Sequence, residues 1–334
     1  MKTKIIMALL ALVPLMGMAQ NMMDSQGRRQ GKWVKMDKNN RKIYEGTFKD
    51  GLEIGTFTYY YADGTVRMKN TFLVDGKFCS HEAYDKNGKL MATGFYNQKN
   101  RDSVWNIFNA EGKLLKSETY KMGTKTGKSV LFSAKGDTIE IQYWNDNKKH
   151  GYWYRKVLDG YLTGNYANNL LDGKYAEYRN NKVVSEGNYS QGLRDGQWKF
   201  YDGNNLDVVE KWNNGNLHDR KVLIYTEQPQ MISTDEIAYF YPKGRNTIVI
   251  TMDGTTMVDQ ENSHKLFEKV GEENFVILNN EKQLVAAYRC IVGFEKDEDG
   301  KEYVELSPKL SFNLYPDDNC RKLVESILRQ GLEK

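Results

Sequence analysis

The sequence predicts a mainly β protein, in which an elongated antiparallel sheet of about eight β-hairpin repeats precedes a small α+β domain. The first observation is a recurring glycine, variable residue and aromatic, with the last three aromatics 22 and then 23 residues apart. The second is a glycine that follows several of these aromatics at a fixed distance. The third is a mean hydropathy of −0.71, which is low for one large compact core. Self-similarity at a nearly fixed period is typical of repeat architectures.

We call the place of the recurring aromatic the repeat position, and it can be assigned in each unit along residues 31–221. Ser129 occupies it in one unit, and Lys221 occupies it in a degenerate ninth unit. Intervals between successive positions run from 21 to 27 residues and are least regular on either side of Phe78. The aromatic repeat positions are Trp33, Phe57, Phe78, Trp105, Trp153, Tyr175 and Trp198.

Turn glycines indicate that each repeat is a hairpin. They lie seven residues after the repeat position and follow residues such as Asp63 and Glu111. An acidic residue or asparagine followed by glycine is typical of a two-residue type I′ turn, because both central residues of that turn need a positive φ. Each repeat is therefore expected to contain two strands of about five residues and a polar loop. The turn glycines are Gly64, Gly112, Gly136 and Gly160.

Alternation within the strands places the aromatics on one face of the sheet. In Trp198-Lys199-Phe200 the two rings share a face and Lys199 points away. Gly187 lies on the aromatic face of its own strand, where it leaves room for a neighbouring ring over the backbone. Since a single hairpin is marginal in water, neighbouring repeats must cover each other, and the C-terminal domain is expected to cover the last repeat at Trp212.

These residues resemble MORN repeats, specifically a bacterial variant of roughly 23 residues with a G-x-W-x-x-Y…G…Y-x-x-G-x-x-x-G pattern. The resemblance is clearest over 151–219 and extends with irregular spacing over 31–150. Ser129 and Lys221 depart from it by lacking the ring, and Asn180-Asn181 replaces the turn glycine. It implies a twisted antiparallel sheet used for protein interaction or self-association, and in some members for binding phospholipid head groups. Some bacterial relatives are described as antitoxin-like.

Residues 1–19 have the three parts of a secretory signal peptide. Two lysines precede an apolar run from Ile5 to Leu15, and small residues follow up to Ala19. We expect cleavage after Ala19, a flexible N-terminal segment over 20–30, and a periplasmic or extracellular protein. The apolar run is far shorter than the roughly 20 residues that cross a bilayer, so no transmembrane segment is expected after cleavage.

Charge divides the chain near residue 222. Residues 20–221 carry 33 Lys and Arg against 24 Asp and Glu, a net charge of +9. Residues 222–334 carry 13 against 20, a net charge of −7. We therefore expect a linker over 222–232 and a separate domain over 233–334.

The C-terminal part is predicted to be a small α+β domain, and it resembles no family that we recognise. One helix is expected from near Ser263, and a second from an N-cap at Asp317 or Asp318. Asp299-Gly300 predicts a hairpin between the fourth and fifth strands. The expected strands are 237–241, 247–252, 275–278, 284–294, 303–306 and 310–315.

Three groups of residues resemble a phosphate-binding loop, a calcium-binding loop and a metal site, and in each case the sequence argues against that site. The segment 123–129 has one residue too few between its glycines for a phosphate-binding loop, and it lies between two hairpins. The acidic residues at 295–299 are too few for a calcium loop and fit a solvated hairpin tip. His150 and His218 are three repeats apart, on the order of 30 Å, and so cannot share a metal ion.

The sequence allows two states for Cys290 and Cys320. Cys290 and Cys320 could form a disulfide in an oxidising compartment, or they could be two small buried thiols. Cys79 is then left over and is expected in the core.

These features favour an exported, non-enzymatic repeat scaffold whose aromatic and basic sheet surface mediates protein–protein interaction or assembly in the bacterial envelope. Rings with Lys and Arg between them suit a protein partner or a glycan. One alternative is binding of anionic lipid or glycan through the basic repeat region, and another is a small catalytic or inhibitory C-terminal domain on a repeat stalk. No catalytic, cofactor-binding or metal-binding residue is assigned, and neither a cofactor nor a nucleic-acid partner is expected.

Overall fold

The computed structural model describes residues 20–279 and 283–332. It confirms a mainly β chain built from antiparallel hairpins, with a small C-terminal part of strands and two helices. The expected signal peptide, residues 1–19, lies outside the described residues. The chain forms two compact units, Met1–Gly151 and Tyr152–Lys334, which are described one at a time.

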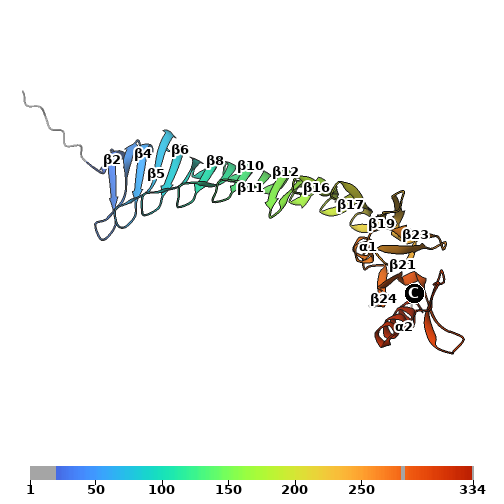
Figure 1. Ribbon diagram of the computed structural model, residues 1–334. Coiled ribbons are helices and arrows are strands. Elements are labelled where there is room, and N and C mark those ends of the chain that lie inside the picture. The colour runs from blue at the N-terminus through green and yellow to red at the C-terminus, as the bar shows by residue number, and fades with distance from the viewer. Residues whose placement is uncertain (1–19, 280–282, 333–334) are drawn as a thin grey trace, which may run out of the picture. The chain divides into compact units, whose positions relative to one another are not determined.

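In the first unit, strands that follow each other in the sequence pair as antiparallel neighbours (Figure 1). The segment 20–30, expected to be flexible, supplies β1 and the start of β2, because Met22 pairs with Gln30. Strand β12 (Lys148–Val157) contains the boundary between the units. The strands of this unit are β1 (Met22–Met23), β2 (Arg29–Met36), β3 (Lys42–Lys49), β4 (Leu52–Tyr60), β5 (Val66–Val74), β6 (Phe78–Tyr84), β7 (Leu90–Asn97), β8 (Asn100–Phe108), β9 (Leu114–Lys121), β10 (Thr124–Phe132) and β11 (Thr138–Asn145).

The second unit begins with the same kind of hairpins. Its repeat strands pair antiparallel, and the last pair joins β19 to β20. The linker expected over 222–232 therefore contains parts of two paired strands and the turn between them. These strands are β13 (Gly160–Ala167), β14 (Leu170–Leu171), β15 (Gly173–Arg179), β16 (Lys182–Ser190), β17 (Leu193–Asp202), β18 (Asn205–Asn213), β19 (Asn216–Ile224) and β20 (Gln230–Ser233).

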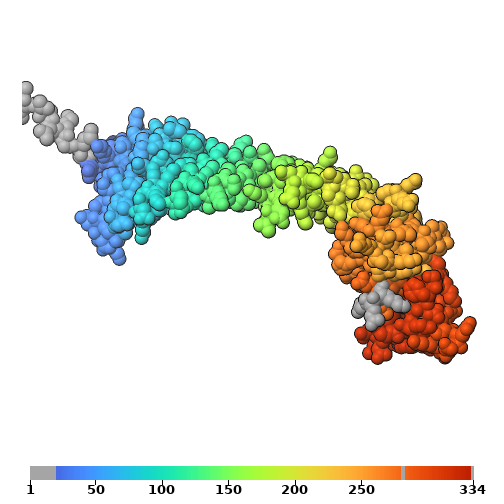
Figure 2. Space-filling model, viewed as in Figure 1, coloured from blue at the N-terminus to red at the C-terminus, as the bar shows by residue number. Residues whose placement is uncertain are grey.

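The C-terminal part of this unit is a five-stranded antiparallel sheet in the order β23-β22-β21-β25-β24, a β26–β27 hairpin and two helices. Figure 2 shows this part, in orange and red, as a body of closely packed side chains. The predicted N-cap of α2 is confirmed, since Asp317 Oδ1 accepts a hydrogen bond from the Cys320 N–H at 2.7 Å. The elements are β21 (Ile237–Lys243), β22 (Asn246–Thr251), β23 (Thr256–Asp259), α1 (Ser263–Val270), β24 (Phe275–Asn279), β25 (Leu284–Ala287), β26 (Ile291–Lys296), β27 (Glu302–Leu306) and α2 (Asp318–Leu332), with short 3₁₀ turns at Thr234–Glu236 and Tyr288–Cys290.

Two strand predictions in this part were wrong in detail. The run 284–294 is two strands separated by the 3₁₀ turn, which buries Cys290. The run 310–315 is not a strand, because within the described residues only Leu314 forms a bridge, to Val304. Its apolar residues are periodic because Leu310 and Leu314 pack on the core.

A central row of side chains runs across the repeat strands on one face. Large rings in this row lie directly over glycines of the preceding strand. A Cβ atom added to Gly46, Gly94 or Gly187 would lie within 2.4 Å of a ring atom of Phe57, Trp105 or Trp198. The prediction that such glycines make room for a ring is thus confirmed. In the first unit the row consists of Trp33, Gly46, Phe57, Asn70, His81, Gly94, Trp105, Glu118, Ser129 and Gln142, and in the second unit it includes Gly164, Tyr175, Gly187, Trp198, Glu210 and Arg220.

The strand register corrects two of the predicted repeat positions. His81 pairs with Gly94 as Trp33 pairs with Gly46, so His81 and not Phe78 occupies the row in the third repeat. The intervals on either side of His81 are then both 24 residues. Phe78 stacks instead on Phe95, with ring centroids 5.5 Å apart.

At the far end of the row, the predicted position Lys221 is exposed, whereas its neighbour Arg220 is the residue that pairs with Glu210 of the row. A search for glycine followed by an aromatic misses His81 and Arg220, because neither residue has the expected aromatic ring.

The turn type predicted for three of the glycines was wrong. Gly64 has φ 89°, but Asp63 before it has no positive φ. The Gly64 N–H donates to Tyr61 O at 3.0 Å and the Tyr61 N–H donates to Thr65 O at 2.8 Å, which makes a three-residue loop with glycine in the left-handed region. Gly112 and Gly136 close equivalent loops.

Two-residue type I′ turns do occur, at the polar linkers between repeats. Asp50-Gly51 and Asn214-Gly215 both have positive φ at the two central positions. Gly160 differs again, because it starts β13 without a positive φ. A Cβ there would lie 1.8 Å from the carbonyl oxygen of Tyr178, so close backbone approach requires this glycine.

Candidate functional site

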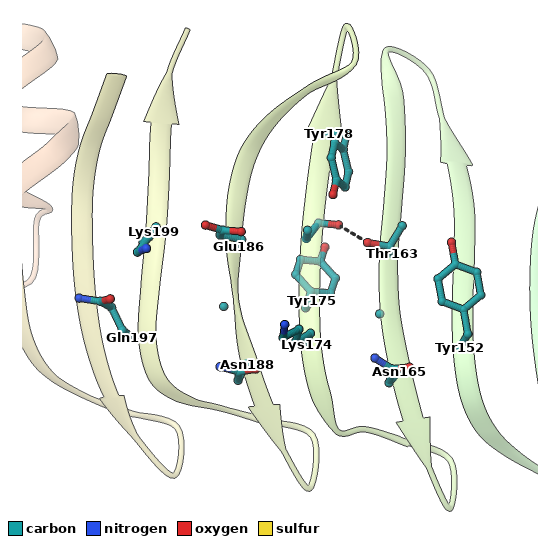
Figure 3. Close-up of a pocket in the computed structure, with 13 residues that line it drawn as sticks. Tyr152, Thr163, Asn165, Lys174, Tyr175, Tyr178, Glu186, Asn188, Gln197 and Lys199 are labelled. Carbon is teal, nitrogen blue, oxygen red and sulfur yellow. Dashed lines mark hydrogen bonds between the residues drawn. The ribbon is translucent and has the colours of Figure 1, made fainter. Parts of the chain in front are cut away.

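A groove of about 520 Å³ crosses the sheet of the second unit from β12 to β17. Figure 3 shows Tyr152 at one end of the groove and Gln197 and Lys199 at the other. The side chains between them come from β13, β15 and β16. The lining residues are Tyr152, Thr163, Gly164, Asn165, Lys174, Tyr175, Ala176, Tyr178, Glu186, Gly187, Asn188, Gln197 and Lys199.

Strand alternation explains why these residues meet. Successive side chains of a strand point to opposite faces, so Lys174 and Ala176 lie on the face opposite to Tyr175. Tyr175 belongs to the central row and packs against Trp198, with centroids 5.7 Å apart. The central row fills one face of the sheet, and the residues beside it in sequence form the groove on the other. We call this second surface the groove face.

Five polar side chains of the groove have no hydrogen-bond or ion-pair partner among the described residues. Three of them are amides, which can each donate and accept hydrogen bonds, and two are lysines, which only donate. Their exposure allows water to satisfy them now and a ligand to replace that water. The five are Asn165, Lys174, Asn188, Gln197 and Lys199.

Two other polar side chains of the groove already have partners. Thr163 Oγ1 donates to the carbonyl oxygen of Ala176 at 3.5 Å, a long hydrogen bond. Glu186 Oε1 accepts from the hydroxyl of Tyr201 at 2.8 Å. Burial, together with this hydrogen bond to a carboxylate, raises the pKa of Tyr201 to about 12. Tyr201 therefore remains a neutral donor that fixes the Glu186 carboxylate.

Tyrosines border the groove. Tyr178 stacks on Tyr161 with centroids 4.4 Å apart and planes 15° apart, and Tyr161 contacts Tyr154 at 5.5 Å. Tyr152 is 44 % exposed, and partial burial raises its pKa. Tyr152 is therefore neutral near pH 7, and the tyrosines offer ring faces and hydroxyl groups.

A second cavity, of about 350 Å³, lies in the first unit around His81. His81 Nδ1 is 2.7 Å from Asn70 Oδ1, and its ring contacts Trp105. Burial, and then the positive charge of Arg101, lower the pKa of His81, while burial raises the pKa of Cys79. A neutral thiol is a poor nucleophile, so these groups are better suited to core packing than to covalent chemistry.

The predicted aromatic positions are mainly structural. Phe57, Trp105, Trp153 and Trp198 are each at most 6 % exposed, whereas Trp33, Phe78 and Tyr175 are partly exposed. Sequence reasoning therefore missed the groove, which is formed by residues next to the repeat positions. The available signal was the alternation itself, which puts Tyr152, Lys174 and Lys199 together on the other face.

The cysteines do not form a disulfide. All three are buried free thiols, and Cys290 Sγ lies 3.3 Å from Met252 Sδ, so the disulfide considered between Cys290 and Cys320 is absent from the structure.

The two segments that resembled phosphate and calcium sites belong to hairpins. The segment 123–129 lies mostly in strand β10, and no helix follows it. The acidic residues at 295–299 form the end of the β26–β27 hairpin, where Asp297 Oδ1 accepts the Lys301 N–H at 2.8 Å.

His150, His218 and His264 are exposed. Over residues 20–279 and 283–332, no group of three or more His, Cys, Asp or Glu side chains is placed to hold a metal ion. In the same ranges, no helix is long and apolar enough to cross a membrane.

This chain has little similarity to known proteins in sequence or in structure. No family model matches the chain, and no curated protein matches it. A crystal structure described as TcdB2-TccC3-TEV matches 66 % of this chain at 11 % sequence identity with a TM-score of 0.16. This chain spans 14 % of the length of that one, and a likeness at this TM-score carries no inference about fold or function.

Proposed function

We propose that this chain is an exported, non-enzymatic scaffold of MORN-like hairpin repeats that binds a partner in the bacterial envelope through its groove face. The observation that carries the proposal is the group of five unpartnered polar side chains that meet in one groove. A concave site in which several hydrogen-bonding groups converge is typical of a ligand-binding site.

Contrast with the other polar groups of the sheet supports this proposal. Glu118 and Glu210 are buried in the central row, and both are paired with cations. The five groove side chains have no such partner in the described part of the chain, which leaves their hydrogen-bonding groups for a ligand.

Site-specific photo-crosslinking of the full chain tests the proposal. A photoreactive residue at Tyr152 would lie in the groove, and one at Tyr288, in the 3₁₀ turn Tyr288–Cys290, would lie outside it. The two tyrosines have similar exposure, at 44 % and 38 %. We expect one envelope component to crosslink from position 152 and not from 288, and Lys199→Glu to reduce that product.

Equal crosslinking from both positions, or no specific product at 152, would contradict a binding role for the groove face. Thermal unfolding of each variant checks that the sheet is intact.

A further inference from the structure

The chemistry of the groove identifies the class of its ligand. Asn165, Asn188 and Gln197 each offer an amide oxygen and an amide NH₂ group, and the hydroxyl of Tyr152 can donate or accept. Groups that both donate and accept match a ligand with the same property. Sugar hydroxyl and acetamido groups have it, whereas phosphate and carboxylate ligands mainly accept.

Charge in the groove argues against a strongly anionic ligand. Lys174 and Lys199 are present, but the Glu186 carboxylate lies between them on β16, and Glu186 is the cross-strand partner of Lys199. Tyr201 holds Glu186 in place at 2.8 Å. A phosphate or lipid head group would meet this fixed negative charge together with the two ammonium groups. An uncharged polar ligand can accept from the lysines and donate to Glu186.

Aromatic rings are placed to contact the apolar side of such a ligand. Tyr152 is exposed at one end of the groove, and Tyr178 lines it from β15 with its ring fixed by stacking on Tyr161. Pyranose rings have one face of C–H groups, and flat aromatic surfaces that lose little conformational entropy bind such faces well.

The dimensions suit a chain of sugars. Five neighbouring strands line the groove, and strands lie about 4.8 Å apart, so it extends across roughly 20 Å. A peptide that adds to a sheet needs a free strand edge for its backbone, but this groove lies on the face of the sheet.

We propose that the groove binds an oligosaccharide, with sugar rings against Tyr152 and Tyr178 and with polar sugar groups bound by Asn165, Asn188, Gln197 and Glu186. This inference rests on the proposed function and names the chemical class of the partner. The long axis of the bound oligosaccharide crosses the strands.

Titration calorimetry on the full chain tests the inference with defined probes. The panel contains hexasaccharides of β-1,4-linked glucose, β-1,4-linked N-acetylglucosamine and α-1,4-linked glucose, together with inorganic phosphate and vesicles rich in anionic lipid. We expect at least one hexasaccharide to bind, with an affinity that changes little with salt because the ligand is neutral. Phosphate and vesicles should not compete with it.

Variants locate the binding. Tyr152→Ala and Asn188→Ala should each weaken hexasaccharide binding by about tenfold, because each removes one direct contact. The controls are Tyr288→Ala and Asn106→Ala, which alter the same residue types at positions that do not line the groove. They should bind as the unaltered chain does.

The inference is overturned if no hexasaccharide of the panel binds, if the groove variants bind as well as the controls, or if only phosphate or anionic vesicles bind. A specific protein crosslink at position 152 without hexasaccharide binding would overturn this inference and leave the proposed function standing. Hexasaccharide binding together with a crosslinked glycan, and no crosslinked protein, at position 152 would support this inference and limit the proposed function to a glycan partner.

Discussion

At the scale of single residues, the central row follows a rule of complementary size. Beneath the rings of Phe57, Trp105 and Trp198, the strand before supplies a glycine, as in Gly187 beneath Trp198. Where the row contains Ser129, its cross-strand neighbour is the larger Glu118. The row is therefore filled in each repeat, although the residues that fill it differ.

Gly187→Ala tests this rule. The added Cβ would lie 2.3 Å from the indole ring of Trp198, so we expect a loss of about 1–3 kcal/mol in the free energy of unfolding. Urea denaturation followed by tryptophan fluorescence measures it. Gly293→Ala is the control, because a Cβ there meets nothing within 4 Å, and it should change stability by less than about 0.5 kcal/mol.

Combining Gly187→Ala with Trp198→Leu should cost less than the sum of the two single changes, because the smaller side chain makes room for the methyl group. Strict additivity would show that the close approach seen at Gly187 does not matter for stability.

Glu118 provides a prediction about pH. Burial alone would raise its pKa, but hydrogen bonds from Lys116, Lys125 and Tyr120 outweigh burial and lower the pKa from 4.5 to about 2. A carboxylate with a lowered folded-state pKa stabilises the fold above its unfolded pKa and loses that contribution as the pH falls. We expect a loss on the order of 2–3 kcal/mol between about pH 5.5 and 2 that is absent in Glu118→Gln.

Urea midpoints across this pH range measure the effect, and the exposed Glu111→Gln serves as the control in the same unit. If Glu118→Gln and the unaltered chain have parallel pH profiles, the ion pairs of Glu118 do not stabilise the fold.

The sequence allowed part of this residue-scale account to be predicted. Aromatic recurrence identified Phe57, Trp105 and Trp198 as positions of the row, since a large ring every 22 to 24 residues is a strong signal. His81 was missed because an imidazole bonded to Asn70 fills the same space by polar contact. Glu118 and Glu210 were missed because buried carboxylates cannot be recognised until the cations that pair with them are placed in space.

At the scale of elements, several of the three-residue loops, although not the one at Tyr61, share a side-chain staple. The first residue of such a loop accepts hydrogen bonds from the backbone N–H groups two and four residues later. Asn109 Oδ1 accepts from Glu111 and Lys113 at 3.1 and 2.8 Å, and Asp85 Oδ1 accepts from Asn87 and Lys89 at 2.8 Å each. These bonds lower the pKa of Asp85. The staple fixes these loops in the conformation that closes their hairpins.

Gly112 closes one of these loops with φ 79°. Gly112→Val should reduce the free energy of unfolding by about 1–2 kcal/mol or more, because a β-branched residue is strained in the left-handed region. Gly112→Asn should cost clearly less, since Asn40 holds the equivalent place in another loop with φ 59°. Equal losses for Val and Asn, measured by urea denaturation, would show that backbone conformation is not what selects glycine here.

Element prediction succeeded where pattern and pairing agree. The repeat hairpins and the cap at Asp317 were found because glycine turns and helix caps are local signals. The strand predicted over 310–315 was wrong because the alternating apolar residues of this run pack on the core without pairing along a strand. Periodicity reports which side chains are buried, and a hydrogen-bonded neighbour is a separate requirement.

At the scale of the whole second unit, the repeat strands and the C-terminal part share one core. Val208, Val222 and Ile224 of β18 and β19 belong to the same buried cluster as Leu266 of α1 and Val324 of α2. Arg220 of β19 donates to the carbonyl oxygen of Val270 at 2.9 Å, which ties the last strands to the end of α1. The C-terminal part thus covers the end of the repeats at Val208, Val222 and Ile224. Trp212, which was expected to be covered, is not part of this core and instead contacts Glu210 and Arg194. A chain cut near residue 222 would expose this core.

A shared core predicts shared unfolding. Leu266 is fully buried in α1, so Leu266→Ala should cost about 2–5 kcal/mol through lost contacts and a cavity. Hydrogen exchange followed by mass spectrometry should then show faster exchange in β18 and β19 as well as in β21 and β22, because one cooperative unit opens. Leu158→Ala is the matched control, since Leu158 is 97 % exposed and its truncation should leave protection unchanged. Faster exchange confined to residues after 233 would show that the repeats are stable without their C-terminal cover, and that the charge boundary near 222 also separates two cooperative units.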